Sequence, residues 1–241
     1  MPNPLAEQLR SIAPTVSVGV LTADLMALGA DVRRVEEAGV RILHFDVMDG
    51  CFCPMLTVGP AFIRAVKTPL FKDVHLMIEE PLDKLEPYVA AGADMITVHI
   101  EACRHPHRVL QALGRMTNAN DAARGLLRGI ALNPGTPLEG VEPLLDELDM
   151  IVLLAVNPGW GGQKFIGAVR RKMDRLIELL YKEKRDILVG LDGGITRDNI
   201  AEAARMRADI IVTGSAVFDG KAPAENARFM MAELAAARKG M

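Results

Sequence analysis

Eight short apolar segments recur along this 241-residue chain, and each is followed by a segment with helical periodicity. β-Branched and aliphatic residues predict strands at 17–21, 41–48, 73–78, 95–100, 129–132, 150–156, 187–191 and 209–213. These strands are too apolar for a sheet with one face in water, and are typical of a parallel sheet covered by helices. The alternation therefore predicts an α/β fold, a (β/α)8 TIM barrel. A doubly wound open sheet is the structural alternative.

Apolar residues three and four positions apart predict the helices, as at Val169, Met173, Leu176 and Leu180. The expected helices cover 28–39, 60–66, 82–91, 107–116, 138–148, 169–180, 199–207 and 224–237. The polar stretch 117–124 reads as a surface extension after the fourth helix. No linker or low-complexity stretch divides the chain, so we expect one barrel domain over residues 1–241.

Composition excludes several classes of function. Half of the residues are hydrophobic, 24% are charged and the formal net charge is -3, without a basic stripe for nucleic acid. No apolar run is long enough to span a membrane, and the N-terminus lacks the apolar core of a secretory signal. Three cysteines without framework spacing read as free thiols in the cytoplasm, and Cys51 and Cys53 lack the second pair of a zinc site.

Polar residues gather where the predicted strands end, which is where barrel enzymes hold their catalytic groups. His44 and Asp46 are two residues apart on the second strand and therefore project from the same side. His75 lies within the apolar third strand, and Asp192 ends the seventh. Two imidazoles and two carboxylates are costly to bury unless they bind a cation. This set suits one divalent ion: zinc, iron(II), manganese or cobalt.

Glycine-rich loops follow the last three predicted strands. They contribute Gly159, Trp160, Gly161 and Gly162, then Gly193 and Gly194, and finally Gly214 and Ser215. Glycine lets backbone N–H groups approach an anion, and loops after the seventh and eighth strands commonly hold phosphate in this fold. Tight turns would explain each cluster separately, but not their presence on three consecutive loops.

Simpler interpretations exist for individual residues. A lone buried histidine is usually a hydrogen-bonded core residue, and an aspartate at a strand end can cap the next helix. Four such groups at one rim favour a site instead. His99, at the end of the fourth strand, fits two interpretations equally well: support of a neighbouring metal ligand, and plain packing. His105 and His107 read as solvated loop residues.

Metal, two carboxylates and a phosphate anchor suit proton abstraction beside a carbonyl, with the metal polarising the carbonyl and holding the enediolate. If Asp46 and Asp192 approach from opposite faces, one removes the proton and the other returns it. The result is inversion at carbon.

The chain resembles the ribulose-phosphate 3-epimerase family from about residue 18 to residue 219. The resemblance is carried by HFDVMDG (44–50), DVHLMIEEP (73–81), VNPGWGGQKF (156–165), LDGGI (191–195) and GSAVF (214–218), in this order. It implies a barrel of the ribulose-phosphate-binding type with His44, Asp46, His75 and Asp192 as metal ligands, and Asp46 and Asp192 as the acid/base pair.

The resemblance also implies substrate contacts. These fall at His75, Met48, Met77, Gly159, Trp160, Gly161, Gly162, Gly193, Gly194, Gly214 and Ser215. For Met48 and Met77, placed beside the reacting carbons by this resemblance, core filling is the competing interpretation.

Three residues depart from the family pattern: Gly19 stands where Ser is usual, Met55 where Asn is usual, and Leu154 where a methionine is usual. Ser17 points the same way along its strand as residue 19 and could replace the missing hydroxyl.

The leading hypothesis is therefore epimerisation of D-ribulose 5-phosphate to D-xylulose 5-phosphate. A paralogue acting on allulose 6-phosphate or a tetrulose phosphate is the alternative, and a non-catalytic sugar-phosphate-binding barrel is a third. The expected partner is a small ketose phosphate, not nucleic acid or membrane, and we expect a cytoplasmic homo-oligomer.

Overall fold

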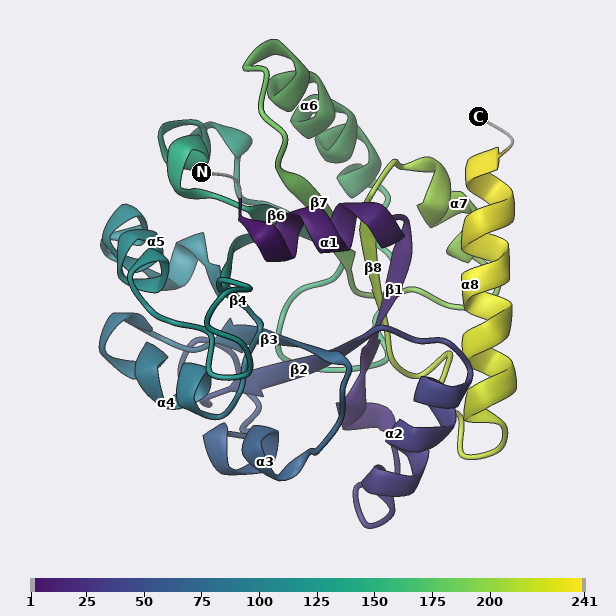
Figure 1. The fold of residues 1–241 in the computed structure, drawn as a ribbon. Coiled ribbons are helices and arrows are strands. Elements are labelled where there is room, and N and C mark those ends of the chain that lie inside the picture. Colours follow the sequence, from purple (N-terminus) through teal and green to yellow (C-terminus); the bar gives the residue numbers. More distant parts are fainter. Residues whose placement is uncertain (1–2, 240–241) are drawn as a thin grey trace.

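All eight expected strands form in the computed structural model, which describes residues 3–239, and they close into a parallel barrel in chain order (Figure 1). The strands are β1 (Thr15–Gly19), β2 (Ile42–Met48), β3 (Phe71–Met77), β4 (Met95–His99), β5 (Leu127–Leu132), β6 (Met150–Leu154), β7 (Leu188–Asp192) and β8 (Ile210–Thr213). β8 pairs with β1 through Thr15 and Ile210, which closes the ring. The prediction of a (β/α)8 barrel is thus confirmed, and the open doubly wound sheet is wrong.

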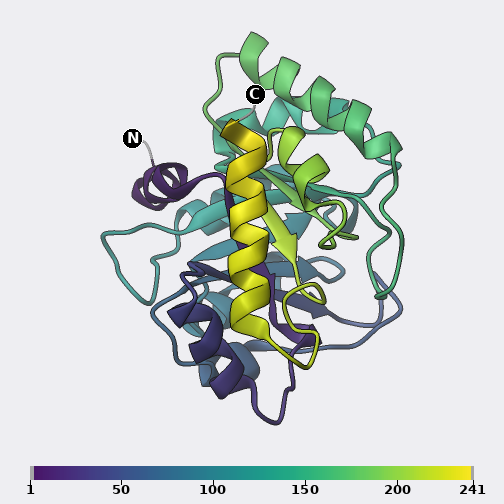
Figure 2. The ribbon, with the colours of Figure 1, turned by 90° about the vertical axis from the view of Figure 1, so that its right-hand side faces the viewer.

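Helices cover the outside of the barrel. They are α2 (Leu28–Glu37), α3 (Pro60–Ala65), α4 (Leu85–Ala90), α5 (Pro106–Gly114), α6 (Ala168–Lys182), α7 (Ile200–Arg205) and α8 (Pro223–Lys239). The long α8 runs along the barrel wall and contacts both α2 and α7 (Figures 1 and 2). The outward residues of the strands pack beneath these helices in the larger hydrophobic core.

The helix expected at 138–148 is wrong in type. Two short 3₁₀ segments, Leu138–Gly140 and Glu142–Glu147, take its place. Pro143 has no backbone N–H to donate, and Gly140 is a poor helix former. The apolar spacing still predicts burial correctly, because Leu144 and Leu145 are buried against the barrel.

One helix was not anticipated: α1 (Pro4–Ile12) lies across one end of the barrel, as Figure 1 shows. Asn3 caps it by accepting a hydrogen bond from the Leu5 N–H, and Pro4 occupies the first turn, where the missing N–H costs nothing. Its buried side chains Leu5 and Leu9 join the lowest inward-facing layer of the barrel: Ile42, Met95, Leu127, Met150, Leu188 and Ile210. α1 therefore plugs the N-terminal end, which leaves the opposite end free for a site.

The stretch 117–124 is more than a surface extension. Asn118 is only 2% exposed and donates a hydrogen bond of 3.1 Å to Asp94 Oδ1, while Arg124 forms an ion pair of 3.0 Å with the same carboxylate. A buried charge needs such partners, and these residues supply them. His105 and His107 are exposed, as expected. No helix within residues 3–239 is long and apolar enough to cross a membrane.

Candidate active site

Four predicted ligands converge at the open end of the barrel. His44 and Asp46 are inward-facing residues of β2, His75 faces inward from β3, and Asp192 ends β7. The strand register brings them together, since Asp46 lies opposite His75. One ligand atom from each of the four residues lies within 4.8 Å of the other three.

The nitrogen and oxygen atoms of this cluster face one another across a small gap. His44 Nε2 lies 3.2 Å from Asp46 Oδ1 and 3.8 Å from Asp192 Oδ2. His75 Nδ1 lies 3.6 Å and 3.3 Å from the same two oxygens. Although His75 Nδ1 is buried, it has no hydrogen-bond partner among the described residues. A buried nitrogen left without a partner is costly, and a bound cation would remove that cost.

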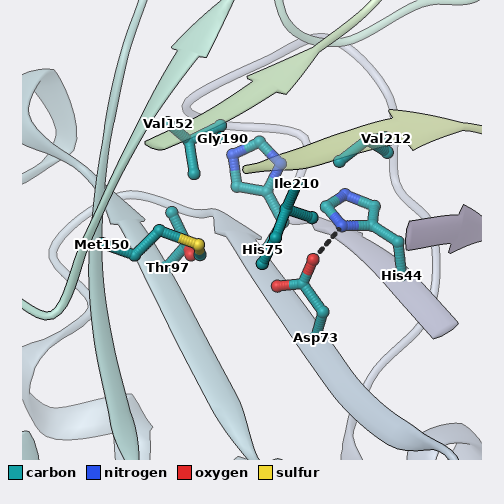
Figure 3. Close-up of a pocket in the computed structure, with 9 residues that line it drawn as sticks. All are labelled: His44, Asp73, His75, Thr97, Met150, Val152, Gly190, Ile210 and Val212. Atoms are coloured by element: carbon teal, nitrogen blue, oxygen red, sulfur yellow. Dashed lines mark hydrogen bonds and ion pairs between the residues drawn. The ribbon is translucent and has the colours of Figure 1, made fainter. Parts of the chain in front are cut away.

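Asp73, which sequence reasoning missed, holds His44 from below. Its Oδ2 lies 2.8 Å from His44 Nδ1 and accepts a hydrogen bond of 3.1 Å from Ser17 Oγ (Figure 3). Asp73 stands two residues before His75 on β3, so strand alternation alone could have placed it inside the barrel. Ser17 is fully buried in this contact and does not line the cleft above, so it does not replace a hydroxyl at position 19.

The carboxylates and imidazoles of the cluster shift one another's pKa values. Burial opposes a charge on His44, but the Asp46 and Asp73 carboxylates outweigh it and raise the pKa of His44 well above its usual value. Burial likewise opposes ionisation of Asp46, yet His44 and His75 hold its pKa below the usual range. Three buried or nearly buried carboxylates thus surround two imidazoles. An imidazole and carboxylate donor set of this kind fits a divalent transition metal or zinc.

His99 contacts the ligand candidate His75 from the side, so its contacts favour support of a ligand over plain packing. Its Nε2 lies 2.9 Å from His75 Nε2, and its Nδ1 lies 3.1 Å from Glu101 Oε2. Burial dominates and lowers the pKa of His99 to about 4, so the ring is neutral near pH 7. Phe52 packs on it, with ring centroids 4.8 Å apart.

The acid stability of the fold should depend on Glu101. Burial alone would raise its pKa, but donors on His99, Thr136 and Asn133 outweigh it and lower the pKa to about 2. A carboxylate with a lowered pKa stabilises the fold above its unfolded value of 4.5, and that contribution is lost as the pH falls towards 2. Glu101 is partly exposed and solvent screens its charge, so we expect Glu101→Gln to remove only about 1 kcal/mol of this pH-dependent term. Urea unfolding of metal-free protein between pH 3 and pH 7 measures it, and parallel curves for both proteins would contradict the prediction.

A cleft of about 800 Å³ opens above the four ligands. Most of the predicted substrate contacts line it, together with both acid/base candidates: Asp46, Met48, Met77, Gly159, Trp160, Gly161, Gly162, Asp192, Gly193, Gly194, Gly214 and Ser215. His44 and His75 lie below its floor, where they line a small internal cavity of about 10 Å³ with Asp73 and Thr97 (Figure 3). The structure therefore places His75 as a ligand candidate beneath the cleft and not on its wall.

The glycine loops present unpaired backbone donors to this cleft. Within residues 3–239, the N–H groups of Gly193, Gly194, Gly214 and Ser215 donate to no backbone acceptor. Gly193 and Gly194 have φ values of 102° and 68°, a left-handed conformation that other residues rarely adopt. A Cβ on Gly194 would also lie 2.9 Å from Phe165 N. Such a cradle of N–H groups suits a phosphate.

Gly19, Met55 and Leu154, the three residues that depart from the family pattern, all line the same cleft. Met55 is 43% exposed, whereas Leu154 is buried at 3% exposure. A Cβ on Gly19 would meet only ordinary contacts, the nearest being Gly214 Cα at 3.5 Å. A serine therefore fits at position 19.

A closed (β/α)8 barrel with an imidazole and carboxylate cluster below a glycine-lined cleft defines a class of barrel enzymes that act on phosphorylated substrates. A model of the ribulose-phosphate 3 epimerase family matches residues 15–218, and the chain belongs to this family. It is thus an isomerase of the epimerase type.

Known proteins agree with this assignment. Ribulose-phosphate 3-epimerase of Bacillus subtilis is 41% identical over 206 residues, which cover 84% of this chain and 91% of that protein. The protein of the same name from Synechocystis is 40% identical over 215 residues, covering 87% and 90%. Among solved structures, 3-hexulose-6-phosphate synthase from Salmonella typhimurium aligns with a TM-score of 0.65 at 20% identity, covering 92% of this chain and 99% of that one. That likeness shows the fold alone.

Proposed function

We propose that this protein interconverts D-ribulose 5-phosphate and D-xylulose 5-phosphate by inverting C3, with one divalent metal ion. The observation that carries the proposal is the placement of the two carboxylates Asp46 and Asp192 between the cleft and the two imidazoles. The names and sequence similarity of the relatives support the substrate class.

His44, Asp46, His75 and Asp192 would hold the metal ion. When bound, the ion polarises the substrate carbonyl and offsets negative charge that develops on its oxygen. The unpaired N–H groups of the glycine loops bind the phosphate and set the distance from there to the reacting carbon. Met48 and Met77 line the cleft beside the carboxylates and exclude water from it.

Asp46 and Asp192 carry the proton. β2 and β7 are separated in the ring by β1 and β8, so the two carboxylates enter the cleft from different sides. One carboxylate takes the proton from C3, and the electrons of that C–H bond move towards the carbonyl. The other, in its protonated form, returns a proton to the opposite face of the carbon. Each turnover leaves the two carboxyl groups with exchanged protonation states, which the reverse reaction or solvent restores.

A panel of ketose phosphates tests the proposal directly. Purified, metal-loaded protein is expected to give its highest kcat/KM with ribulose 5-phosphate. A higher value with allulose 6-phosphate or a tetrulose phosphate would favour the paralogue, for which Gly19, Met55 and Leu154 in the cleft wall are the specific observation.

The departing residues should affect binding more than turnover. Gly19 and Met55 offer no side-chain hydrogen-bond donor, and a substrate oxygen desolvated without a partner costs about 1–3 kcal/mol. We expect the double variant Gly19→Ser with Met55→Asn to lower KM for ribulose 5-phosphate roughly tenfold, since 1.4 kcal/mol is a factor of ten. kcat should change little. A raised KM, together with a better alternative substrate for the unmodified protein, would show that the cleft is shaped for another sugar.

A further inference from the structure

His99 and Glu101 form a hydrogen-bonded chain that ends on the ligand His75. The His75 and His99 ring planes differ by only 16°, with centroids 4.9 Å apart. Their Nε2 atoms lie 2.9 Å apart, so the two ring edges are within hydrogen-bonding distance. The His99 side chain is fully buried. Water therefore does not compete for this contact.

The direction of the hydrogen bonds in this chain follows from Glu101. Its Oε1 accepts from the Asn133 N–H at 2.7 Å, and its Oε2 lies 3.1 Å from His99 Nδ1. An ionised carboxylate only accepts, so His99 Nδ1 must carry the proton. His75 Nδ1 makes no hydrogen bond among the described residues, so the proton of a neutral His75 lies on Nε2, where it is donated to the lone pair of His99 Nε2. The lone pair of His75 is thereby left on Nδ1, the atom that faces Asp46 and Asp192.

We infer that His99 and Glu101 are positioning residues that fix His75 as the Nε2–H tautomer, so that its Nδ1 is presented to a divalent cation. The inference rests on the proposed metal site. His44 is oriented in the opposite sense, because Asp73 accepts from its Nδ1 and leaves Nε2 for the site (Figure 3). The two imidazoles therefore offer different ring nitrogens, selected at His44 by the Asp73 carboxylate and at His75 by His99, which Glu101 orients.

Glu101→Gln is the discriminating change, because it alters donors and acceptors with almost no change in shape. Both Glu101 oxygens face N–H groups, whereas glutamine has only one oxygen. If that oxygen accepts from the Asn133 N–H, the amide NH₂ donates to His99 Nδ1. His99 must then donate from Nε2, and His75 is left with its proton on Nδ1, where the cation should bind. If the oxygen accepts from His99 Nδ1 instead, His75 keeps its tautomer and the Asn133 N–H loses its acceptor.

The experiment measures the Zn²⁺ affinity of purified protein by competition with a chromophoric chelator. Loss of an outer hydrogen bond to a ligand typically weakens metal binding by roughly 10–100-fold, and this is the loss expected for Glu101→Gln. The matched control is Glu139→Gln, the same change at a glutamate whose side chain is 65% exposed and paired with Arg175. The control should bind Zn²⁺ as the unmodified protein does.

Variants of His99 separate positioning from folding. His99→Gln can still present an oxygen to His75, whereas His99→Leu removes the acceptor. We expect the glutamine variant to retain a higher Zn²⁺ affinity than the leucine variant, at similar melting temperatures of the metal-free proteins. The absorption spectrum of the Co²⁺-loaded protein should change in His99→Leu, because it reports on the ligand field and not on folding.

Each outcome decides the inference. A Zn²⁺ affinity of Glu101→Gln within twofold of the unmodified protein, together with equal Zn²⁺ affinities of His99→Gln and His99→Leu, overturns it and leaves the proposed function standing. Equal losses in Glu101→Gln and Glu139→Gln also overturn it, since the effect would then not pass through His75. Failure of the unmodified protein to bind any of the metals would overturn the proposed metal site itself, and the inference with it.

Discussion

Asp46→Asn and Asp192→Asn are each expected to reduce kcat by more than the roughly 10²–10⁴-fold that general acid/base catalysis alone contributes. Both carboxylates line the cleft and lie in the ligand cluster. Either substitution therefore has two effects: it removes a proton carrier and it weakens metal binding. The measurement is kcat and kcat/KM for ribulose 5-phosphate at saturating metal. Asp174→Asn is the matched control, because that side chain is 73% exposed on the outer helix α6.

Hydrogen exchange at C3 separates the two carboxylates from each other. With one carboxylate replaced, the remaining one can still remove and return a proton on its own face. We therefore expect each variant to exchange the C3 hydrogen of only one epimer with deuterated solvent, and the two variants to prefer opposite epimers. Retention of more than a tenth of the activity by either variant, or exchange of the same epimer by both, would contradict the two-carboxylate mechanism.

The fold could be predicted because each strand is recognisable from its own short stretch of sequence. Buried parallel strands are continuous apolar runs, and eight of them alternating with helices leave few topologies. α1 was missed although Asn3, Pro4, Leu5 and Leu9 show the cap and the spacing of an amphipathic helix. It belongs to no β/α repeat, and only the assembled barrel reveals the open lower end that this helix must cover.

The site could be predicted only as far as strand alternation reaches. His44, Asp46 and His75 follow from their places on two strands, and the structure brings them together with Asp192. The contact from His75 to His99 depends instead on the register between β3 and β4 and on the side-chain rotamers. A single sequence contains neither. The structure also shows why Ser17 does not replace a hydroxyl at position 19. Ser17 has the same orientation as residue 19, but it lies one layer lower in the barrel, hydrogen-bonded to Asp73.

Removal of the metal is expected to abolish activity, and the proposed ligand set explains which ions restore it. Stabilisation of charge at a polarised carbonyl is worth several kcal/mol, so chelation should lower kcat by roughly 10²-fold or more. Elemental analysis of active protein should give one divalent ion per chain. His44 and His75 provide two nitrogen ligands, which suit Zn²⁺, Fe²⁺, Mn²⁺ or Co²⁺ better than the oxygen-seeking Ca²⁺ and Mg²⁺.

Reconstitution provides the control for that experiment. Chelated protein that keeps its melting transition should recover activity with Zn²⁺, Fe²⁺, Mn²⁺ or Co²⁺, and should recover much less with Ca²⁺. The double variant His44→Gln with His75→Gln should recover with none of them, because it retains the carboxylates of Asp46 and Asp192 but loses both nitrogen ligands. Full activity in chelated protein shown by elemental analysis to be free of metal would refute the metal site. In that case the buried carboxylates would have to be balanced by protons on the two histidines, whose raised pKa values already favour that state.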